Sequence, residues 1–288
     1  MNKAPFDKGE VEVLLRWQYL GRVSYFVLVS LLIVPGTIIA ISYLLMSPQD
    51  ALYVVPIALV ATSFGSNTAY HMYFTHRTFT TGRLFHAVLA FLGTILCQDS
   101  IAQWVANHKR HHRHTDVVNK DPHTPWQFGE SKWLAMAIGL LWASAGWKFS
   151  RIKSVTVFYA RQITDDPIAP WFDRHFVTIS LAVLILPGIA GWLVDGRELA
   201  LKWFCYFGAF RVFIGYFFTE CVVNGLCHAL GSRKFHVKGK STNLVLTWPR
   251  SRLAQRYSTI IIPSRAYCRQ PLVEKLTQCK CFTGYLKN

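Results

Sequence analysis

Charged residues are scarce in this sequence, and acidic residues are scarcer than basic ones. Only 16% of the 288 residues are charged, while 52% are hydrophobic. This balance favours an integral membrane protein over a soluble globular one. The surplus of Lys and Arg gives a net charge of +16. Because these basic residues mostly flank apolar stretches and form no long soluble patch, we interpret them as contacts with anionic lipid and not as a nucleic-acid surface.

Paired cysteines are also missing. None of the seven cysteines forms a Cys-x-x-Cys pair, and Cys279 and Cys281 are too close together to predict a zinc site. Cys97, Cys205 and Cys221 lie in apolar stretches, where cysteine behaves as a small hydrophobic residue. The sequence therefore predicts no disulfide framework and fits a reducing compartment. We expect no secretory signal, because acidic residues interrupt the N-terminal segment before any apolar core.

Four apolar stretches are long enough to cross a bilayer, and they set the predicted fold. A helix rises about 1.5 Å per residue, so roughly 20 apolar residues span the hydrocarbon core. We predict an all-α integral membrane protein with about four transmembrane helices and a cytosolic helical cap. The predicted spans are residues 24–46, 51–70, 171–192 and 203–223, with residues 193–202 joining the last two.

The distribution of basic residues predicts the topology. The turn at 47–50 has no Lys or Arg, whereas the arm at 1–23 and the loop at 77–170 are rich in them. By the positive-inside rule, both termini and the histidine-rich segments described below are cytosolic. We divide the chain into the cytosolic arm, a membrane domain at 24–248, and a divergent basic tail at 249–288.

Some residues within and between the spans predict further detail. Arg211 and Glu220 interrupt the last span, and charged groups at membrane depth usually face a bundle interior or a cavity. The apolar stretches at 84–97 and 133–147 are short for spanning, so we predict interfacial or cytosolic helices there.

Five of the 11 histidines fall in two short runs, and both runs lie close to apolar helices. On a helix, His108 and His112 share one face while His111 points about 100° away, so one helix could serve two adjacent metal ions. His71 and His76 are five residues apart, a spacing that does not bring two side chains together on a straight α-helix. They converge more easily if the end of the helix departs from regular α geometry. Imidazole binds several transition metals, so the ligand type alone does not identify the metal. The alternative, that these are merely polar residues of a basic loop, is disfavoured because there are two spaced clusters.

These runs resemble the histidine boxes of the membrane fatty acid desaturases of the stearoyl-CoA type. Residues 71–79 resemble the first box, and residues 107–116 with 121–125 resemble the second. Residues 224–228 resemble the Asn-x-x-x-His element of the same family, and the similarity covers roughly residues 20–245. It implies four transmembrane helices, a di-iron centre on the cytosolic face, and O2-dependent insertion of a cis double bond into an acyl chain.

The resemblance also implies the ligands of two iron ions (Fe2+) and the partners of the reaction. The first ion would be held by His71, His76, His108 and His112. The second would be held by His111 and His228, with Asn224 approaching through a water, whereas His123 is not expected to bind metal. No catalytic residue is implied beyond the metal centre. The partners would be a fatty acyl substrate carried on CoA or a lipid, O2, membrane lipid, and a separate cytochrome b5- or ferredoxin-like electron-transfer protein.

The third histidine box of that family is missing. Residues 241–243 match the element that precedes it, but no histidine occurs after His236. The first ion would lose one ligand and the second would lose two. The basic tail would result either from a change of reading frame between about 248 and 257 or from divergence. The leading interpretation is a desaturase, or a chain descended from one, and the missing third box leaves open whether this sequence is active. The alternatives are a catalytically dead membrane scaffold and a related lipid hydroxylase. A metal transporter is disfavoured because the histidines gather at one face.

Overall fold

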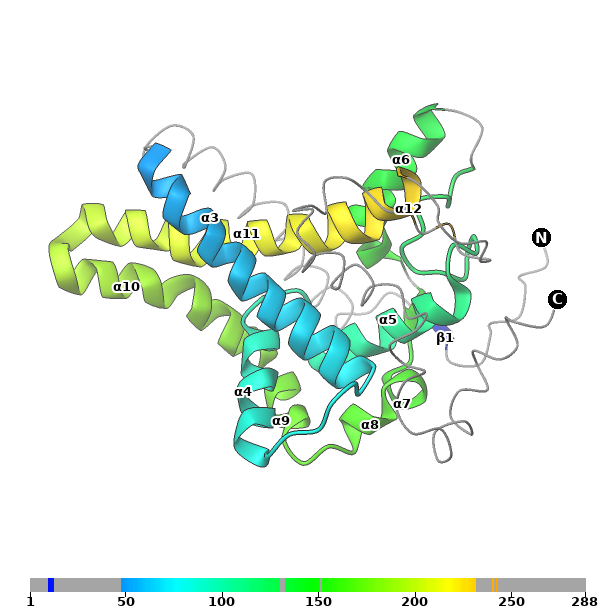
Figure 1. Cartoon of the computed structure of the whole chain (residues 1–288), viewed down its shortest axis with the longest axis horizontal. Coiled ribbons are helices and arrows are strands. Elements are labelled where there is room, and N and C mark those ends of the chain that lie inside the picture. Colours follow the sequence, from blue (N-terminus) through cyan, green and yellow to red (C-terminus); the bar gives the residue numbers. More distant parts are fainter. Residues whose placement is uncertain are drawn as a thin grey trace. The chain divides into compact units, whose positions relative to one another are not determined.

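A computed structural model describes residues 10–12, 48–129, 133–150, 152–231, 240 and 242 (Figure 1). The chain divides into two units, residues 1–225 and 226–288. The predicted span at 24–46, most of the arm at 1–23 and the tail at 249–288 lie outside the described residues.

The described elements are almost all helical. In chain order they are β1 (Glu10–Glu12), α3 (Pro48–Thr62), η2 (Ser63–Thr75), α4 (Arg83–Thr94), α5 (Ile101–His114), α6 (Trp133–Ser144), η3 (Gly146–Phe149), β2 (Ile152–Ser154), α7 (Thr156–Tyr159), α8 (Arg161–Thr164), α9 (Ala169–Arg174), α10 (Phe176–Trp203), η4 (Phe204–Phe210), α11 (Arg211–Tyr216), η5 (Phe217–Leu226) and α12 (Cys227–Ala229). The elements η2, η4 and η5 are π-helical, and η3 is a 3-10 turn. The short strands β1 and β2 pair antiparallel, with Glu10 opposite Ser154. Apart from this pair, the described residues confirm the prediction of a helical protein.

Two helical segments among the described residues are long and apolar enough to cross a membrane, judged by length and composition. The first is Leu52–Thr75, which combines most of α3 with η2 and matches the span predicted at 51–70. The second, Phe176–Ala229, extends over most of the two spans predicted at 171–192 and 203–223.

The second segment is a hairpin and not one straight helix. Inside α10, only Asp195 and Gly196 leave helical conformation, and Gly196 has a φ of 70°, which favours glycine. The two arms then run side by side (Figure 1). A methyl group added at Gly208 would lie 2.5 Å from the Leu184 carbonyl oxygen, so glycine permits this close approach. The reversal lies within the stretch 193–202 that is predicted to join the two spans, but only Asp195 and Gly196 leave helical conformation inside α10, so the connection is shorter than that stretch.

Both shorter apolar stretches form helices, as predicted. The stretch at 84–97 largely corresponds to α4 and the stretch at 133–147 to α6. Each helix exposes large apolar side chains near its N-terminal end, and Leu84 and Trp133 are each 82% exposed. Their placement at a membrane interface remains a prediction.

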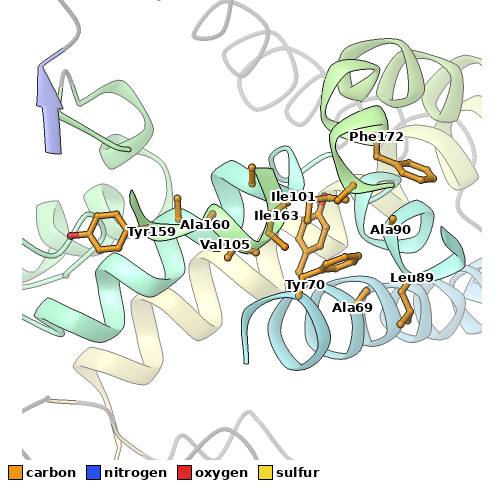
Figure 2. Close-up of a cluster of buried hydrophobic side chains, with 14 residues drawn as sticks. Ala69, Tyr70, Leu89, Ala90, Ile101, Val105, Tyr159, Ala160, Ile163 and Phe172 are labelled. Atoms are coloured by element: carbon orange, nitrogen blue, oxygen red, sulfur yellow. The ribbon is translucent and has the colours of Figure 1, made fainter. Parts of the chain in front are cut away.

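The main apolar core holds η2 against α5. Figure 2 shows Ala69 and Tyr70 of η2 in one cluster with Ile101 and Val105 of α5, and with residues of α4, α7, α8 and α9. The ring of Tyr70 is fully buried, and its hydroxyl donates a hydrogen bond to the carbonyl oxygen of Asp99 at 2.9 Å. Because η2 and α5 carry the two histidine runs, this core determines how the runs meet.

Candidate metal centre

The N-terminal end of α5 is held by polar side chains. The Ser100 side chain caps the helix by accepting a hydrogen bond from the backbone N–H of Gln103. The carboxylate of Asp173 in α9 accepts from the backbone N–H of Ile101 at 2.7 Å and of Ala102 at 3.1 Å. A carboxylate is favourable at this end of the helix dipole. These contacts set the position of the helix that carries the second histidine run.

His108 and His112 lie one turn apart on α5, and their rings meet edge to face, with planes 85° apart. Their Nε2 atoms are 2.9 Å apart and their ring centroids 4.5 Å apart. His111 points in another direction, and its ring centroid lies 6.1 Å from that of His108. The prediction that one helix presents histidines in two directions is therefore confirmed.

The π-helix η2 brings His71 and His76 together. A π-helix joins residues five apart by hydrogen bonds, so such residues lie above one another. The backbone N–H of His76 donates to the carbonyl oxygen of His71 at 3.0 Å, and the two ring centroids are 4.5 Å apart. The expectation that this helix departs from straight α geometry is confirmed, and π winding is the means.

A polar network supports the end of η2. The hydroxyl of Tyr73 lies 2.8 Å from Nδ1 of His86, whose Nε2 lies 3.0 Å from the Asp166 carboxylate. Asp166 also accepts hydrogen bonds from two backbone N–H groups at the start of α9. His86 thus connects η2, α4 and α9 and has a structural role outside the histidine groups.

The two runs form one four-histidine group. The ligand atoms of His71, His76, His108 and His112 all lie within 4.8 Å of one another. Between the runs, the ring centroids of His71 and His108 are 4.8 Å apart, and those of His76 and His112 are 5.0 Å apart. Within the described residues, Nδ1 of His71 is buried without a hydrogen-bond partner.

The protonation of this group suits a metal ion. Burial and the nearby His112 hold the pKa of His108 well below its ordinary value, and burial together with Lys109 lowers the pKa of His76 to about 4. These imidazoles are therefore neutral near pH 7, which is the form that binds a metal. Four imidazoles in mutual reach are a suitable donor set for a transition-metal ion. The residues thus fit a metal ion.

A second group consists of His111, Asp121 and His123, all buried, with ligand atoms within 4.8 Å of one another. Nδ1 of His111 lies 2.9 Å from Oδ2 of Asp121, and the rings of His111 and His123 stack with centroids 4.4 Å apart. Burial lowers the pKa of His111, but Asp121 outweighs burial, so the pKa of His111 is raised overall. Asp121 was not among the predicted ligands, since its spacing from His111 gives no indication that the two side chains meet.

A small cavity adjoins both groups. Its lining residues come from α5, η3, η5 and the loops between, and they include His108, His123, Lys148, Glu220 and Asn224. The side chains of Lys148 and Glu220 form an ion pair of 3.0 Å and are 7% and 3% exposed. Nδ2 of Asn224 donates a hydrogen bond to the other Glu220 oxygen at 2.9 Å. The prediction that Glu220 faces an interior cavity is confirmed, whereas sequence reasoning did not identify Lys148 as its partner.

His228 belongs to α12 in the second unit, where its side chain is buried. In that unit the hydroxyl of Thr242 donates to the carbonyl oxygen of Cys227 at 2.8 Å. The assignment of His228 as a ligand remains a prediction. The expected position of the third histidine box, about 248–257, lies outside the described residues.

Comparison with known families gives a match over most of the chain. A sequence model of the family described as fatty acid desaturase matches residues 50–265, well over half of the chain. The matched region contains every residue of both histidine groups.

The individual proteins that this chain resembles are named as desaturases or as an acetylenase. A hex-5-enoyl-[acyl-carrier protein] acetylenase of Moorena producens (strain JHB) is 29% identical over 77% of this chain and 70% of its own length. An sn-1 stearoyl-lipid 9-desaturase of Anabaena variabilis is 26% identical over 64% of this chain and 61% of its own. The delta-9 acyl-lipid desaturase 1 of Arabidopsis thaliana is 26% identical over 67% of this chain and 58% of its own length. The chain thus spans less than two thirds of the length of the last two proteins.

Proposed function

The chain belongs to the fatty acid desaturase family, a family of oxidoreductases, and we propose that it is an iron-dependent membrane enzyme that inserts a cis double bond into an acyl chain with O2 as the oxidant. The observation that carries this proposal is the convergence of four imidazoles from two separate helices, at His71, His76, His108 and His112. A basic loop whose histidines had no common role would have no reason to bring these rings into mutual reach.

We assign the first iron ion to the four-histidine group and the second to a position beside His111. Hydrogen bonding of Nδ1 of His111 to Asp121 leaves Nε2 as the nitrogen that would face a metal, the usual arrangement of a carboxylate behind a metal-binding histidine. We propose His228, and Asn224 through a water, as the further ligands of the second position, which would still lack the two ligands of the third histidine box. When bound, the iron pair would supply the oxidising chemistry for removing hydrogen from two adjacent unactivated methylenes.

The protein's own contribution is to position the ligands and to exclude water. Trp104 stacks on His108, with ring centroids 4.9 Å apart and planes within 21°. The same indole lines the cavity together with Trp147, which is buried. These aromatic walls would keep the reacting part of an acyl chain dry and hold the His108 ring in one orientation.

We further propose that the chain crosses the membrane four times with its metal centre on the cytosolic side. Leu52–Thr75 would be one span, and the hairpin that reverses at Asp195 and Gly196 would give two. The apolar stretch at 24–46 would be the fourth. The relatives are named for substrates carried on acyl-carrier protein, on lipid or on CoA, and we propose an acyl chain on CoA or lipid as the substrate. A separate electron-transfer protein would supply the electrons.

The test is expression in a host that lacks its own desaturase, followed by fatty-acid profiling and by measurement of iron in the purified chain. We expect unsaturated product and bound iron for the unaltered chain, and no product and less bound iron for the His108→Ala, His112→Ala double variant. The control is His175→Ala, which removes a histidine outside both groups. An absence of both product and iron in the unaltered chain would favour the alternative of a catalytically dead membrane scaffold. A product heavier by one oxygen would favour the hydroxylase.

A further inference from the structure

We propose that Glu220, held by Lys148, is a positioning residue that turns the side-chain carbonyl oxygen of Asn224 toward the second metal position. This inference rests on the proposed function, because it presupposes a metal beside His111. It concerns two residues of this chain, Glu220 and Lys148, that the sequence did not identify as part of the site.

The direction of the Asn224 amide follows from hydrogen-bond chemistry. An ionised carboxylate can only accept hydrogen bonds, so the atom of Asn224 that faces Glu220 must be the amide nitrogen. That contact is 2.9 Å, between Nδ2 of Asn224 and Oε2 of Glu220, one turn apart on η5. The carbonyl oxygen of Asn224 therefore points away from Glu220 and is the atom presented to a ligand. Without Glu220, nothing in this pairing distinguishes the two ends of the amide.

Lys148 holds the carboxylate in place. Its Nζ lies 3.0 Å from Oε1 of Glu220, 3.5 Å from the carbonyl oxygen of Gln98, and 4.4 Å from the centre of the Trp147 ring. The two carboxylate oxygens thus have separate partners, Lys148 on one and Asn224 on the other. This division fixes the rotation of the carboxylate, which in turn fixes the rotation of the amide.

The place of the ion pair argues against a purely structural role. Burying two charges is costly, and replacing such a pair with apolar residues often leaves a protein as stable or more so. Lys148 and Glu220 line a cavity together with His108 and His123, one residue from each histidine group. A charged pair therefore stands where an acyl chain alone would need only apolar walls. Orientation of a ligand amide explains why it is there.

The experiment is an anaerobic titration of the purified full chain with Co2+, monitored by visible absorption and by the number of ions bound. The variants are Glu220→Gln and the double variant Glu220→Gln, Lys148→Met, with Glu198→Gln, an exposed acidic residue, as the matched control. Glutamine has the size of glutamate but can also donate, so Asn224 can rotate. We expect the first ion to bind as in the unaltered chain and the second to bind at least tenfold more weakly, with a changed absorption band, in both variants.

The outcomes separate the inference from the proposed function. Unchanged binding of the second ion in Glu220→Gln would overturn the inference, and so would recovery of that binding in the double variant, because Glu220 would then only neutralise Lys148. If Glu220→Gln does not fold, the double variant, which carries no unpaired charge, decides. One ion in the unaltered chain would overturn the inference and leave the four-histidine site standing. No ions at all would overturn both.

Discussion

Replacing Asp121 with asparagine tests how the second histidine group is held together. The side chain of Asp121 is completely buried, and its two oxygens accept hydrogen bonds from three groups. Oδ2 accepts from Nδ1 of His111 at 2.9 Å and from the backbone N–H of Asp116 at 2.7 Å. Oδ1 accepts from the backbone N–H of His123 at 3.1 Å. Asparagine keeps the shape of the side chain but exchanges one acceptor for a donor.

The expected cost follows from these contacts. Whichever way the new amide is turned, its nitrogen faces at least one N–H donor, so at least one hydrogen bond to a charged group is lost and a buried donor is left unsatisfied. Each of these losses costs on the order of 1–3 kcal/mol, and we expect Asp121→Asn to lower the free energy of unfolding by roughly 2–4 kcal/mol. Because His111 also loses the carboxylate behind it, we expect the affinity for the second metal ion to fall about 10–100-fold.

Two measurements check this expectation. Thermal unfolding of the metal-free protein should show Tm lowered by several degrees, at roughly 2–4 °C per kcal/mol for a chain of this size. A metal titration should show that the first ion binds normally and the second weakly. The control is Asp195→Asn, at the exposed turn of the hairpin. A Tm for Asp121→Asn equal to that of the control would refute the view that the carboxylate holds this group together.

Three further predictions concern the fold and the metal. Gly208→Ala should lower stability by about 1–3 kcal/mol, because its methyl group would press on the Leu184 carbonyl oxygen; Gly82→Ala, where no atom lies within 4 Å of the added methyl, is the matched control for the Tm comparison. Tyr70→Phe should cost about 0.5–1.5 kcal/mol by removing the hydrogen bond to Asp99, again measured by Tm, and an unchanged Tm would contradict it. Removal of iron by a chelator should destabilise the protein by about 2.7 kcal/mol if the ion was present at 100 times its Kd, and an identical Tm before and after chelation would show that no ion stabilises the fold.

The part of the site that could be predicted from the sequence is the part encoded by local spacing. A separation of four residues puts His108 and His112 on one face of any α-helix. The separation of five between His71 and His76 becomes favourable only through π winding, and hydropathy does not reveal π winding. Spacing could therefore nominate the histidines without giving their geometry.

Contacts between distant segments could not be predicted. Lys148 and Glu220 are far apart in the sequence, and their pairing depends on how η5 packs beside the residues that follow α6. The short length of the reversal inside the linker predicted at 193–202 could not be predicted for a related reason. Its charged residues resemble a loop by composition, but the reversal itself involves only Asp195 and Gly196, and Gly196 supplies the positive φ.

The arrangement of α5 has a consequence for how the protein would acquire its ions. Under the proposed assignment, one turn of helix contributes ligands to both ions, because His111 lies between His108 and His112. Binding of the first ion would restrict the motion of this turn. The second ion would then bind to a His111 side chain that is already ordered, at a smaller cost in conformational entropy. Loading would then be positively cooperative, and partially filled chains would be rare at intermediate concentrations of iron.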